Sequence, residues 1–320
     1  MKALITGIGG FVGCHLTRYL IYGGHEISGI DYPDIELPDD IKSQEKLKIY
    51  EGDLRDDKIV SEVMNECKPD AVFHLAAQSS VKISFENPQE TFSDNLFGTL
   101  NLLEVVSKLD YEVKTLVISS SEVYGQLDPE ECPVDEDHPL RPVNPYAVSK
   151  AAVDLMAYQY FKAYKLPVYV ARAFSHSGPG QKTVGVLSDW AFQIAKIELG
   201  LSPPVLKVGN LNVQRDYTDV RDVVRAYMDI IEKGKPGKPY NVCTGKGYKL
   251  SYLLERYRSM AKKDIEVMRD QSRMRPVDIP ILTGSNKRIK EDTGWEPEIE
   301  MEITLADSLK FWYDHLAEEM

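Results

Sequence analysis

The chain has 320 residues, of which 43% are hydrophobic and 28% are charged. At roughly 150 residues per domain, this length predicts about two folding units that bury their cores without disulfide or metal staples. The 38 Lys and Arg residues against 50 Asp and Glu residues give a net charge of −12. This acidic balance argues against a nucleic-acid-binding protein.

Short apolar runs alternate with helical patterns through the first half of the chain. Continuous apolar character is typical of strands that are buried on both faces, as in a parallel sheet with helical crossovers. We therefore expect an α/β fold with a doubly wound parallel sheet of the Rossmann type. The predicted strands are residues 3–6, 26–31, 47–50, 71–75, 115–119 and 168–171.

The first motif lies between the first two predicted strands. It is G-x-x-G-x-x-G at Gly7, Gly10 and Gly13, and it opens a predicted helix. Glycines allow a tight turn and a close approach of the backbone to a pyrophosphate, while the helix N-terminus supplies free N–H groups. With the flanking strand and helix, the motif predicts a dinucleotide site that includes Phe11 and Val12.

The second predicted strand ends at Asp31, where a carboxylate can accept a hydrogen bond from a ribose hydroxyl. Because this charge repels a 2′-phosphate, we expect NAD(H) to be favoured, with NADP(H) possible. Two further strand ends fit the same site, although each alone is also explained by ordinary packing. They contain Asp53, Leu54, Leu75, Ala76 and Ala77.

The catalytic candidates are Ser120, Tyr146 and Lys150. The spacing of Tyr146 and Lys150 places both on one helix face, where an ammonium would lower the tyrosine pKa from about 10 and also hold the nicotinamide ribose. Tyr146 could then exchange a proton with a substrate oxygen. Ser120 follows the fifth predicted strand, at the edge where ligands of such sheets bind. The tyrosine–lysine spacing alone is also compatible with a solvated helix face.

Past residue 173 the pattern loosens into a smaller, mixed α/β lobe that ends in a predicted helix at residues 303–315. Residues 217–243 again suggest a helix followed by a strand that returns to the first sheet. The predicted division is a Rossmann domain at residues 1–172 plus about 217–243, and a substrate lobe at about 173–216 plus 244–320.

These ordered motifs, together with the His-Leu-Ala-Ala segment at 74–77 and the Arg-Asp-Tyr-Thr-Asp-Val run at 215–220, resemble the extended short-chain dehydrogenase/reductases that act on nucleotide sugars. The resemblance implies a catalytic triad of Ser120, Tyr146 and Lys150. It also implies a cofactor in the amino-terminal lobe, a nucleotide sugar in the carboxy-terminal lobe, and a homodimer formed through a four-helix bundle.

The segments 173–181, 207–211, 215–222, 240–245 and 275–280 look most like those of GDP-4-dehydro-6-deoxy-mannose reductases, whose close relatives are GDP-mannose 4,6-dehydratases. By that resemblance Arg215 and Arg275 would grip the diphosphate of a GDP-sugar, although each could instead form an interlobe salt bridge. Ser121 and Ser175 would contact substrate. Ser175 stands where relatives commonly have Asn.

Glu122 does not decide between a dehydratase and a reductase. An acid two residues after the catalytic hydroxyl serves the elimination step in dehydratases, and similar Ser-Ser-Glu runs occur in the reductases. Ser at position 120, the short chain and Asp31 favour a reductase that would make GDP-D-rhamnose with NAD(P)H. A dehydratase is the second reading and a C4 epimerase the third. A non-catalytic dinucleotide-binding protein is disfavoured because Tyr146 and Lys150 are both present.

Four cysteines lie far apart and form no C-x-x-C pair, which is typical of free thiols in a reducing compartment and argues against a zinc site. The chain opens at Met1 without a signal sequence, and no apolar run approaches the ~18 residues that cross a bilayer. We expect a cytoplasmic protein with no metal and no membrane partner. The cysteines are Cys14, Cys67, Cys132 and Cys243.

Overall fold

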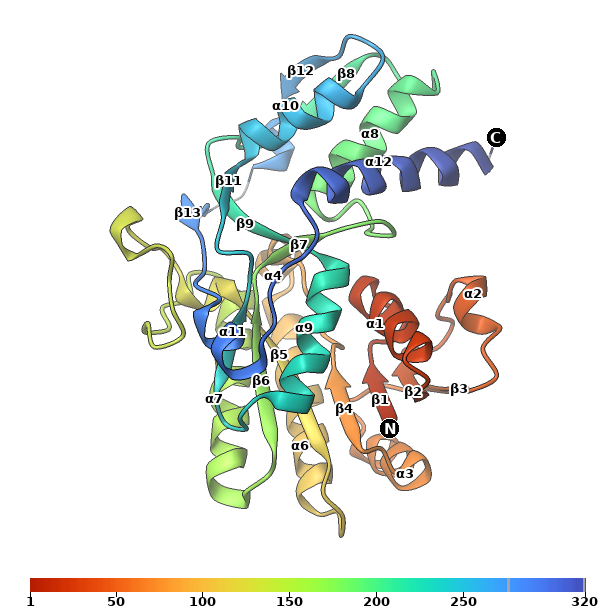
Figure 1. The fold of residues 1–320 in the computed structure, drawn as a ribbon, viewed down its shortest axis with the longest axis vertical. Coiled ribbons are helices and arrows are strands. Elements are labelled where there is room, and N and C mark those ends of the chain that lie inside the picture. The colour runs from red at the N-terminus through yellow and green to blue at the C-terminus, as the bar shows by residue number, and fades with distance from the viewer. Residues whose placement is uncertain (275–276, 319) are drawn as a thin grey trace.

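The computed structural model describes residues 1–274, 277–318 and 320. Its largest element is a seven-stranded parallel sheet with the strand order β10-β6-β5-β4-β1-β2-β3 (Figure 1). The six strands predicted from the sequence are confirmed, with small differences at their ends. The bounds are β1 Lys2–Thr6, β2 Glu26–Asp31, β3 Leu47–Glu51, β4 Ala71–His74, β5 Lys114–Ser120, β6 Val168–Ala173 and β10 Pro239–Val242.

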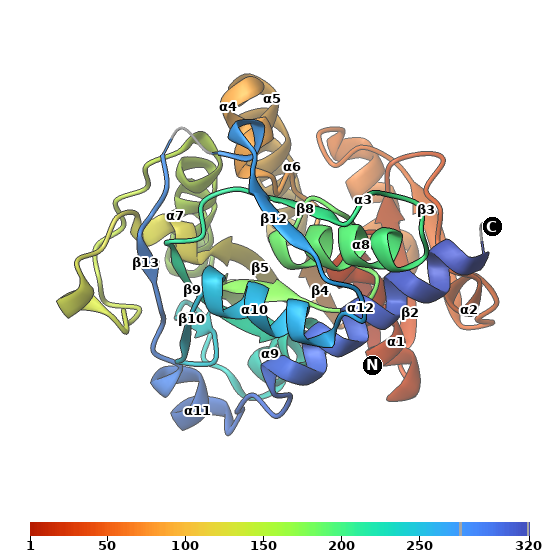
Figure 2. The ribbon, with the colours of Figure 1, turned by 90° about the horizontal axis from the view of Figure 1, so that it is seen from above.

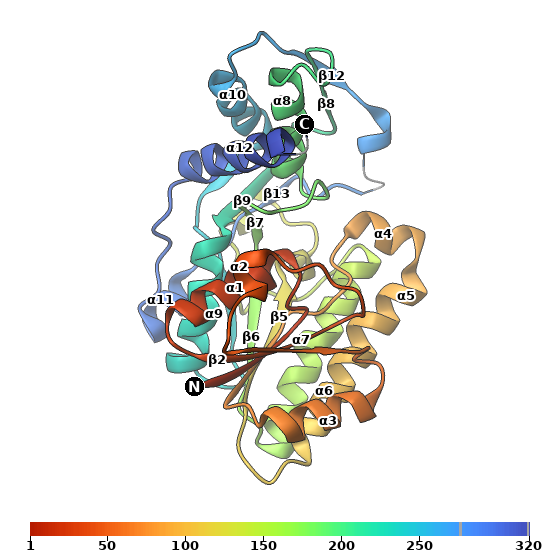
Figure 3. The ribbon, with the colours of Figure 1, turned by 90° about the vertical axis from the view of Figure 1, so that its right-hand side faces the viewer.

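Helices cover both faces of this sheet (Figure 3), which explains why its strands are apolar without alternation. Ile5 of β1 packs in the core that α1 and α9 share, while Leu4 packs on the opposite side with α3 and α6. Helix α7 also lies on this second side, against β5 and β6. The helix bounds are α1 Phe11–Tyr22, α3 Asp57–Cys67, α6 Gly98–Ser107, α7 Pro145–Tyr164 and α9 Val220–Lys233.

Shorter helical segments connect these elements. Helix α5 packs against α7, and α11 packs against α9 and β10. The bounds are α2 Asp39–Lys42, α4 Val81–Glu86, α5 Pro88–Phe92, α11 Lys287–Thr293, a π-helix η1 Ser93–Phe97, and the 3₁₀ turns η2 Ser121–Tyr124, η3 Pro129–Glu131 and η4 Gln271–Arg273.

A second lobe lies beyond the carboxyl ends of the large sheet (Figures 1 and 2). Its helices α8 and α12 pack together around a separate apolar core, and β9 pairs with β7, β11 and β13. Strand β8 pairs with β12. The bounds are α8 Val186–Glu198, α10 Leu250–Met260, α12 Met301–Glu318, β7 Ser175–Ser177, β8 Val205–Val208, β9 Gln214–Asp219, β11 Gly247–Lys249, β12 Glu266–Arg269 and β13 Ile281–Leu282.

The chain passes between the lobes several times. After the second lobe begins, α9 packs against the large sheet and β10 pairs in parallel with β6. Residues 287–295 lie in the stretch that the sequence analysis assigns to the substrate lobe, yet Ile289 and Trp295 are buried in the core of the large sheet beside α9. Within the described residues, none of the helices has the length and apolar character that crossing a bilayer requires.

Candidate active site

The glycine-rich turn joins β1 to α1 at the carboxyl edge of the sheet. Gly7 has a positive φ of 71°, and a Cβ there would lie 2.8 Å from the Ala76 nitrogen. At Gly13 a Cβ would lie 2.3 Å from the Gly7 carbonyl oxygen. Side chains are therefore excluded at both positions. Gly10 caps α1 without a side-chain hydrogen bond, so the helix N-terminus suits a pyrophosphate.

Asp31 lies beside this turn, at the end of the neighbouring strand. Its Oδ2 accepts a hydrogen bond from the Gly9 nitrogen at 2.9 Å, and its Oδ1 accepts one from the Tyr32 nitrogen at 2.9 Å. Each carboxylate oxygen accepts more than one hydrogen bond. The orientation of Asp31 is thus fixed by the backbone while lone pairs remain for a ribose hydroxyl.

The other predicted cofactor residues flank the same edge. Ala76 donates from its nitrogen to the Thr6 hydroxyl at 3.1 Å, and Leu75 donates to the Thr6 carbonyl at 3.2 Å. Ala77 follows directly. Asp53 is paired with Arg55, and Leu54 is buried in the core between α3 and the sheet. Small side chains at positions 76 and 77 keep this part of the backbone open to a dinucleotide.

Ser120 ends β5, two strands away from the glycine turn. Its Oγ accepts a hydrogen bond from the Glu122 nitrogen at 3.2 Å and so caps the 3₁₀ turn η2. Ser121, the first residue of that turn, is buried. Gly125 ends the turn with a φ of 74°, where a Cβ would lie 1.8 Å from the Arg141 carbonyl oxygen. The turn is therefore tightly constrained on both sides.

Tyr146 and Lys150 lie in the first turns of α7, as predicted. Asn144 starts this helix by accepting a hydrogen bond from the Ala147 nitrogen at 2.8 Å, and Pro145 takes the first helical position. The Tyr146 hydroxyl hydrogen-bonds Ser120. The structure thus brings together two candidates that are far apart in the sequence.

The electrostatics of this pair differ from the expectation. Burial raises the pKa of Tyr146 to about 12, and only the hydrogen bond with Ser120 acts in the opposite direction. The Lys150 ammonium donates instead to the Ile118 carbonyl at 2.9 Å, and burial lowers its pKa to about 8. The prediction that Lys150 lowers the pKa of Tyr146 is therefore wrong, because burial outweighs any effect of the ammonium on the phenol.

Glu122 lies next to Ser120 and Tyr146. Its Oε2 accepts a hydrogen bond from the Asn144 amide at 3.1 Å, and its charge adds to the raised pKa of Tyr146. Asn144 was missed by the sequence analysis. An Asn before a Pro is a recognisable helix start, but its contact with a residue 22 positions earlier has no local signal.

The predicted substrate residues lie across the lobe boundary. Ser175 begins β7 and pairs in register with Tyr217 of β9, two residues after Arg215. Arg215 is buried and donates to the Gln214 carbonyl at 2.9 Å. The structure thus places Ser175 and Arg215 on paired strands, whereas Arg275 lies outside the described residues.

Phe11 links the two lobes in a way that the sequence did not indicate. Its ring is stacked with His176 of β7 at a centroid distance of 6.2 Å and meets His15 edge-on. His15 also contacts the Pro179 carbonyl at 2.8 Å. In the described part of the chain no cluster of His, Cys, Asp or Glu side chains could hold a metal ion.

The parallel sheet, the glycine turn and the Ser120–Tyr146–Lys150 group define an extended short-chain dehydrogenase/reductase. A family model described as GDP-mannose 4,6 dehydratase matches residues 4–308. The chain belongs to this family.

The individual relatives include a reductase and dehydratases. The chain is 36% identical to a GDP-6-deoxy-D-mannose reductase of Pseudomonas aeruginosa, with 99% of each chain covered. It is 30% identical to a GDP-mannose 4,6-dehydratase of Yersinia enterocolitica, covering 96% of this chain and 92% of the relative. The solved structure of RMD from Pseudomonas aeruginosa with NADPH superposes with a TM-score of 0.86 at 35% identity, covering 98% and 99% of the two chains.

Proposed function

We propose that the protein reduces the C4 keto group of a GDP-4-keto-6-deoxy hexose with NAD(P)H and forms a GDP-6-deoxy sugar, GDP-D-rhamnose. The observation that carries this proposal is the hydrogen bond between Ser120 and Tyr146, with the pKa of Tyr146 raised to about 12. A phenol with that pKa is protonated at neutral pH and suits proton donation to a carbonyl oxygen. Similarity to the Pseudomonas aeruginosa reductase over the whole chain supports the substrate.

Tyr146, Ser120 and Lys150 have different roles in the proposed reduction. When bound, the nicotinamide supplies hydride to C4 of the sugar. As the carbonyl π bond breaks, Tyr146 gives its proton to O4, and Ser120 donates a hydrogen bond to the same oxygen. Lys150 holds the nicotinamide ribose. With its pKa lowered to about 8, its ammonium remains charged at pH 7 and can donate a hydrogen bond to that ribose.

The dinucleotide would lie along the carboxyl edge of the sheet. We propose that Gly7, Gly10 and Gly13 lie against its pyrophosphate. A Cβ at Gly10 would meet only the Gly7 carbonyl oxygen, at 3.1 Å, so the space on the other side of Gly10 is open to a ligand. Asp31 would accept from a ribose hydroxyl. The remaining contacts that we propose are made by Phe11, Val12, Asp53, Leu54, Leu75, Ala76 and Ala77.

The surroundings of Asp31 support a preference for NADH over NADPH. Tyr32, the residue after Asp31, is surrounded by four charged side chains. Three are carboxylates and one is a guanidinium: Asp31, Asp53, Asp94 and Arg55. The single guanidinium in this group is paired with Asp53 and, at 3.0 Å, with Asp94. A 2′-phosphate would therefore meet more negative than positive charge. We propose that NADH is preferred and that NADPH is also accepted.

The diphosphate of the GDP-sugar would be held by Arg215 and Arg275, with Ser121 and Ser175 closer to the sugar. Arg215 and Ser175 lie on paired strands of the second lobe. The proposed division into a Rossmann part and a substrate lobe is that of the sequence analysis, except that residues 287–295 belong with the Rossmann part because they pack in its core.

We also propose a cytoplasmic homodimer. Apolar side chains on η1 and α7 are exposed, with Phe97 at 56%, Leu155 at 62% and Tyr158 at 50%. Exposed apolar patches of this kind commonly mark an interface. Pairing of these helices between two copies would make the four-helix bundle. A reducing compartment is supported by the four unpaired cysteines.

A 4,6-dehydratase is the second candidate, favoured by the position of the Glu122 carboxylate beside Tyr146. The two functions differ in their use of cofactor. NADH absorbance is followed with purified protein and either GDP-4-keto-6-deoxy-mannose or GDP-mannose. Consumption of one NADH per keto sugar reduced is the expected result. Water loss from GDP-mannose without NADH consumption would reject the reductase and assign Glu122 to the elimination.

A further inference from the structure

A buried arginine lies between the two segments that carry the catalytic pair. Arg172 of β6 donates from Nε and Nη2 to the two carboxylate oxygens of Asp154, at 2.7 and 3.1 Å. Its Nη1 donates to the Tyr124 hydroxyl at 3.1 Å and to the Glu136 carbonyl at 2.9 Å. The guanidinium carbon also lies 5.3 Å from the centre of the Tyr124 ring. All three nitrogens of the guanidinium are thus engaged.

Its two side-chain partners belong to the catalytic segments. Asp154 lies one helical turn beyond Lys150, at the i, i+4 spacing that places both on one side of α7. Tyr124 is the last residue of the 3₁₀ turn that Ser120 caps. One side chain therefore connects the helix that carries Tyr146 to the turn that holds Ser120.

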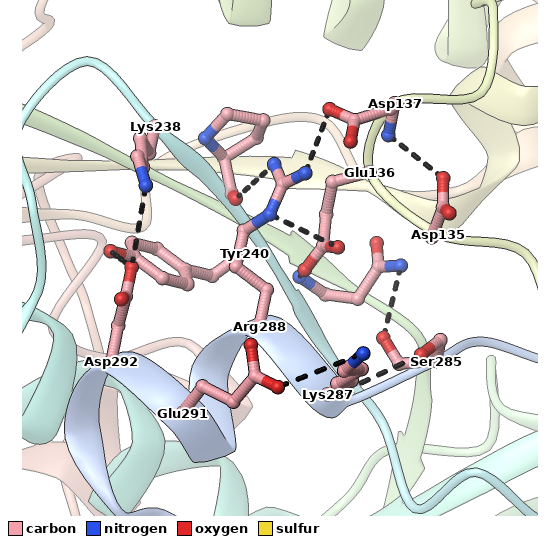
Figure 4. A network of polar contacts seen from close by, with 12 residues as sticks. Asp135, Glu136, Asp137, Lys238, Tyr240, Ser285, Lys287, Arg288, Glu291 and Asp292 are labelled. Carbon is pink, nitrogen blue, oxygen red and sulfur yellow. Dashed lines mark hydrogen bonds and ion pairs between the residues drawn. The ribbon is translucent and has the colours of Figure 1, made fainter.

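The network continues away from the site. The Tyr124 hydroxyl donates to the Asn241 side chain at 2.6 Å, and the Asn241 nitrogen donates to Glu136 Oε1 at 2.8 Å. Figure 4 shows the outer end, where Arg288 lies between Glu136 and Asp137. The polar groups of Tyr124 thus have partners on both sides, which restricts its ring and the turn that contains it.

A contribution to folding stability does not explain this arrangement well. Removing two charges from water costs about as much free energy as their attraction in the interior returns. A planar guanidinium does, however, fix several partners in defined directions at once. We propose that Arg172 and Tyr124 are positioning residues, which keep the Ser120 turn and α7 at the separation where Ser120 and Tyr146 hydrogen-bond. This inference rests on the proposed reductase.

The test compares Arg172→Lys and Tyr124→Phe with two matched controls, Arg225→Lys and Tyr240→Phe. Tyr240, like Tyr124, is fully buried and donates its hydroxyl, in this case to Asp292 at 2.9 Å (Figure 4). Arg225 of α9, like Arg172, is paired with carboxylates and lies over an aromatic ring, that of Trp295. Each control loses a similar polar group in a place that does not contact the Ser120 turn or α7.

Steady-state kinetics, the primary deuterium isotope effect on kcat and NADH affinity by fluorescence are measured for all variants. Misplacing a reacting group by about 1 Å can cost about 100-fold in rate, so kcat is expected to fall by about 10- to 100-fold in Arg172→Lys and Tyr124→Phe. The isotope effect should rise as the chemical step becomes limiting. The NADH affinity and the KM for substrate should stay within about twofold, and the controls should keep wild-type kcat.

The outcomes separate this inference from the proposed function. Wild-type protein that consumes no NADH with the keto sugar would refute the function, and the positioning role with it. Active wild-type protein whose Arg172 and Tyr124 variants keep kcat, or lose it only as far as the controls do, would overturn the positioning role alone. Tyr124→Phe removes a single oxygen, so it decides the question if Arg172→Lys does not fold.

Discussion

The Tyr146 hydroxyl lies within hydrogen-bond reach of Ser120, and burial raises its pKa to about 12. Motif spacing was sufficient to predict that Tyr146 and Lys150 share one helix, and the structure places this helix against the end of β5, where Ser120 lies. The spacing was insufficient to predict their electrostatics, because desolvation of a side chain depends on the atoms that tertiary packing places around it. The same reason explains why the contact between Asn144 and Glu122 had no sequence signal.

Tyr146→Phe tests the proton donor. The substitution removes only the hydroxyl, so turnover with the keto sugar should fall by about 10²- to 10⁴-fold, the usual contribution of a positioned acid. NADH affinity, measured by fluorescence titration, should change little because the ring that remains fills the same space. Near-normal turnover of the variant would rule out Tyr146 as the donor.

Asp31→Asn tests the basis of the proposed cofactor preference. An Asn side chain can still accept the Gly9 hydrogen bond but carries no charge. The ratio of kcat/KM for NADPH to that for NADH should rise by about tenfold, equivalent to about 1.4 kcal/mol. The matched control is Asp34→Asn, an exposed position nearby that changes the net charge equally. An unchanged ratio, or an equal change in the control, would contradict the assignment.

At the scale of secondary structure, the apolar runs predicted each strand because helices cover both faces of the large sheet. The contacts between neighbouring strands and helices depend on individual side chains, which the pattern of apolar residues does not specify. His74, at the end of β4, is fully enclosed, with Nδ1 2.8 Å from the Thr6 hydroxyl and Nε2 2.9 Å from the Thr99 hydroxyl. In its neutral form, His74 of β4 therefore hydrogen-bonds both β1 and α6.

The pKa of His74 predicts a pH dependence of stability. Burial lowers it from 6.5 to about 3, so below pH 6.5 the unfolded chain binds a proton that the folded chain does not. The free energy of unfolding should consequently fall as the pH drops, by about 2 kcal/mol from this residue between pH 7 and pH 5. Urea unfolding of wild type and His74→Gln at both pH values measures it. Equal losses in both proteins would show that His74 does not contribute.

At the scale of the whole molecule, the chain builds its site by crossing between the lobes. The return of α9 and β10 to the large sheet could be predicted, since an amphipathic helix followed by a short apolar strand repeats the pattern of the first half. The packing of residues 287–295 on the large sheet could not, because Ile289 and Trp295 would be equally suited to the core of either lobe.

Leu155→Glu tests the proposed dimer. Leu155 is 62% exposed on α7, and a carboxylate there would be costly to bury between two copies. Light scattering after gel filtration should give a dimer for the wild type and a monomer for the variant, with a circular dichroism spectrum that shows the variant to be folded. Tyr22→Glu, a control at a 96% exposed position on α1, should remain dimeric. A monomeric wild type, or a dimeric Leu155→Glu protein, would contradict the interface.

In the proposed reduction, hydride passes from the cofactor to C4 of the sugar while Tyr146 supplies the proton on O4. The most direct measurement uses NADH that carries deuterium at the transferred position, with GDP-4-keto-6-deoxy-mannose as substrate and NMR analysis of the product. We expect one deuterium at C4 and one NADH consumed for each sugar reduced. A product without deuterium at C4, or conversion without net NADH oxidation, would contradict it.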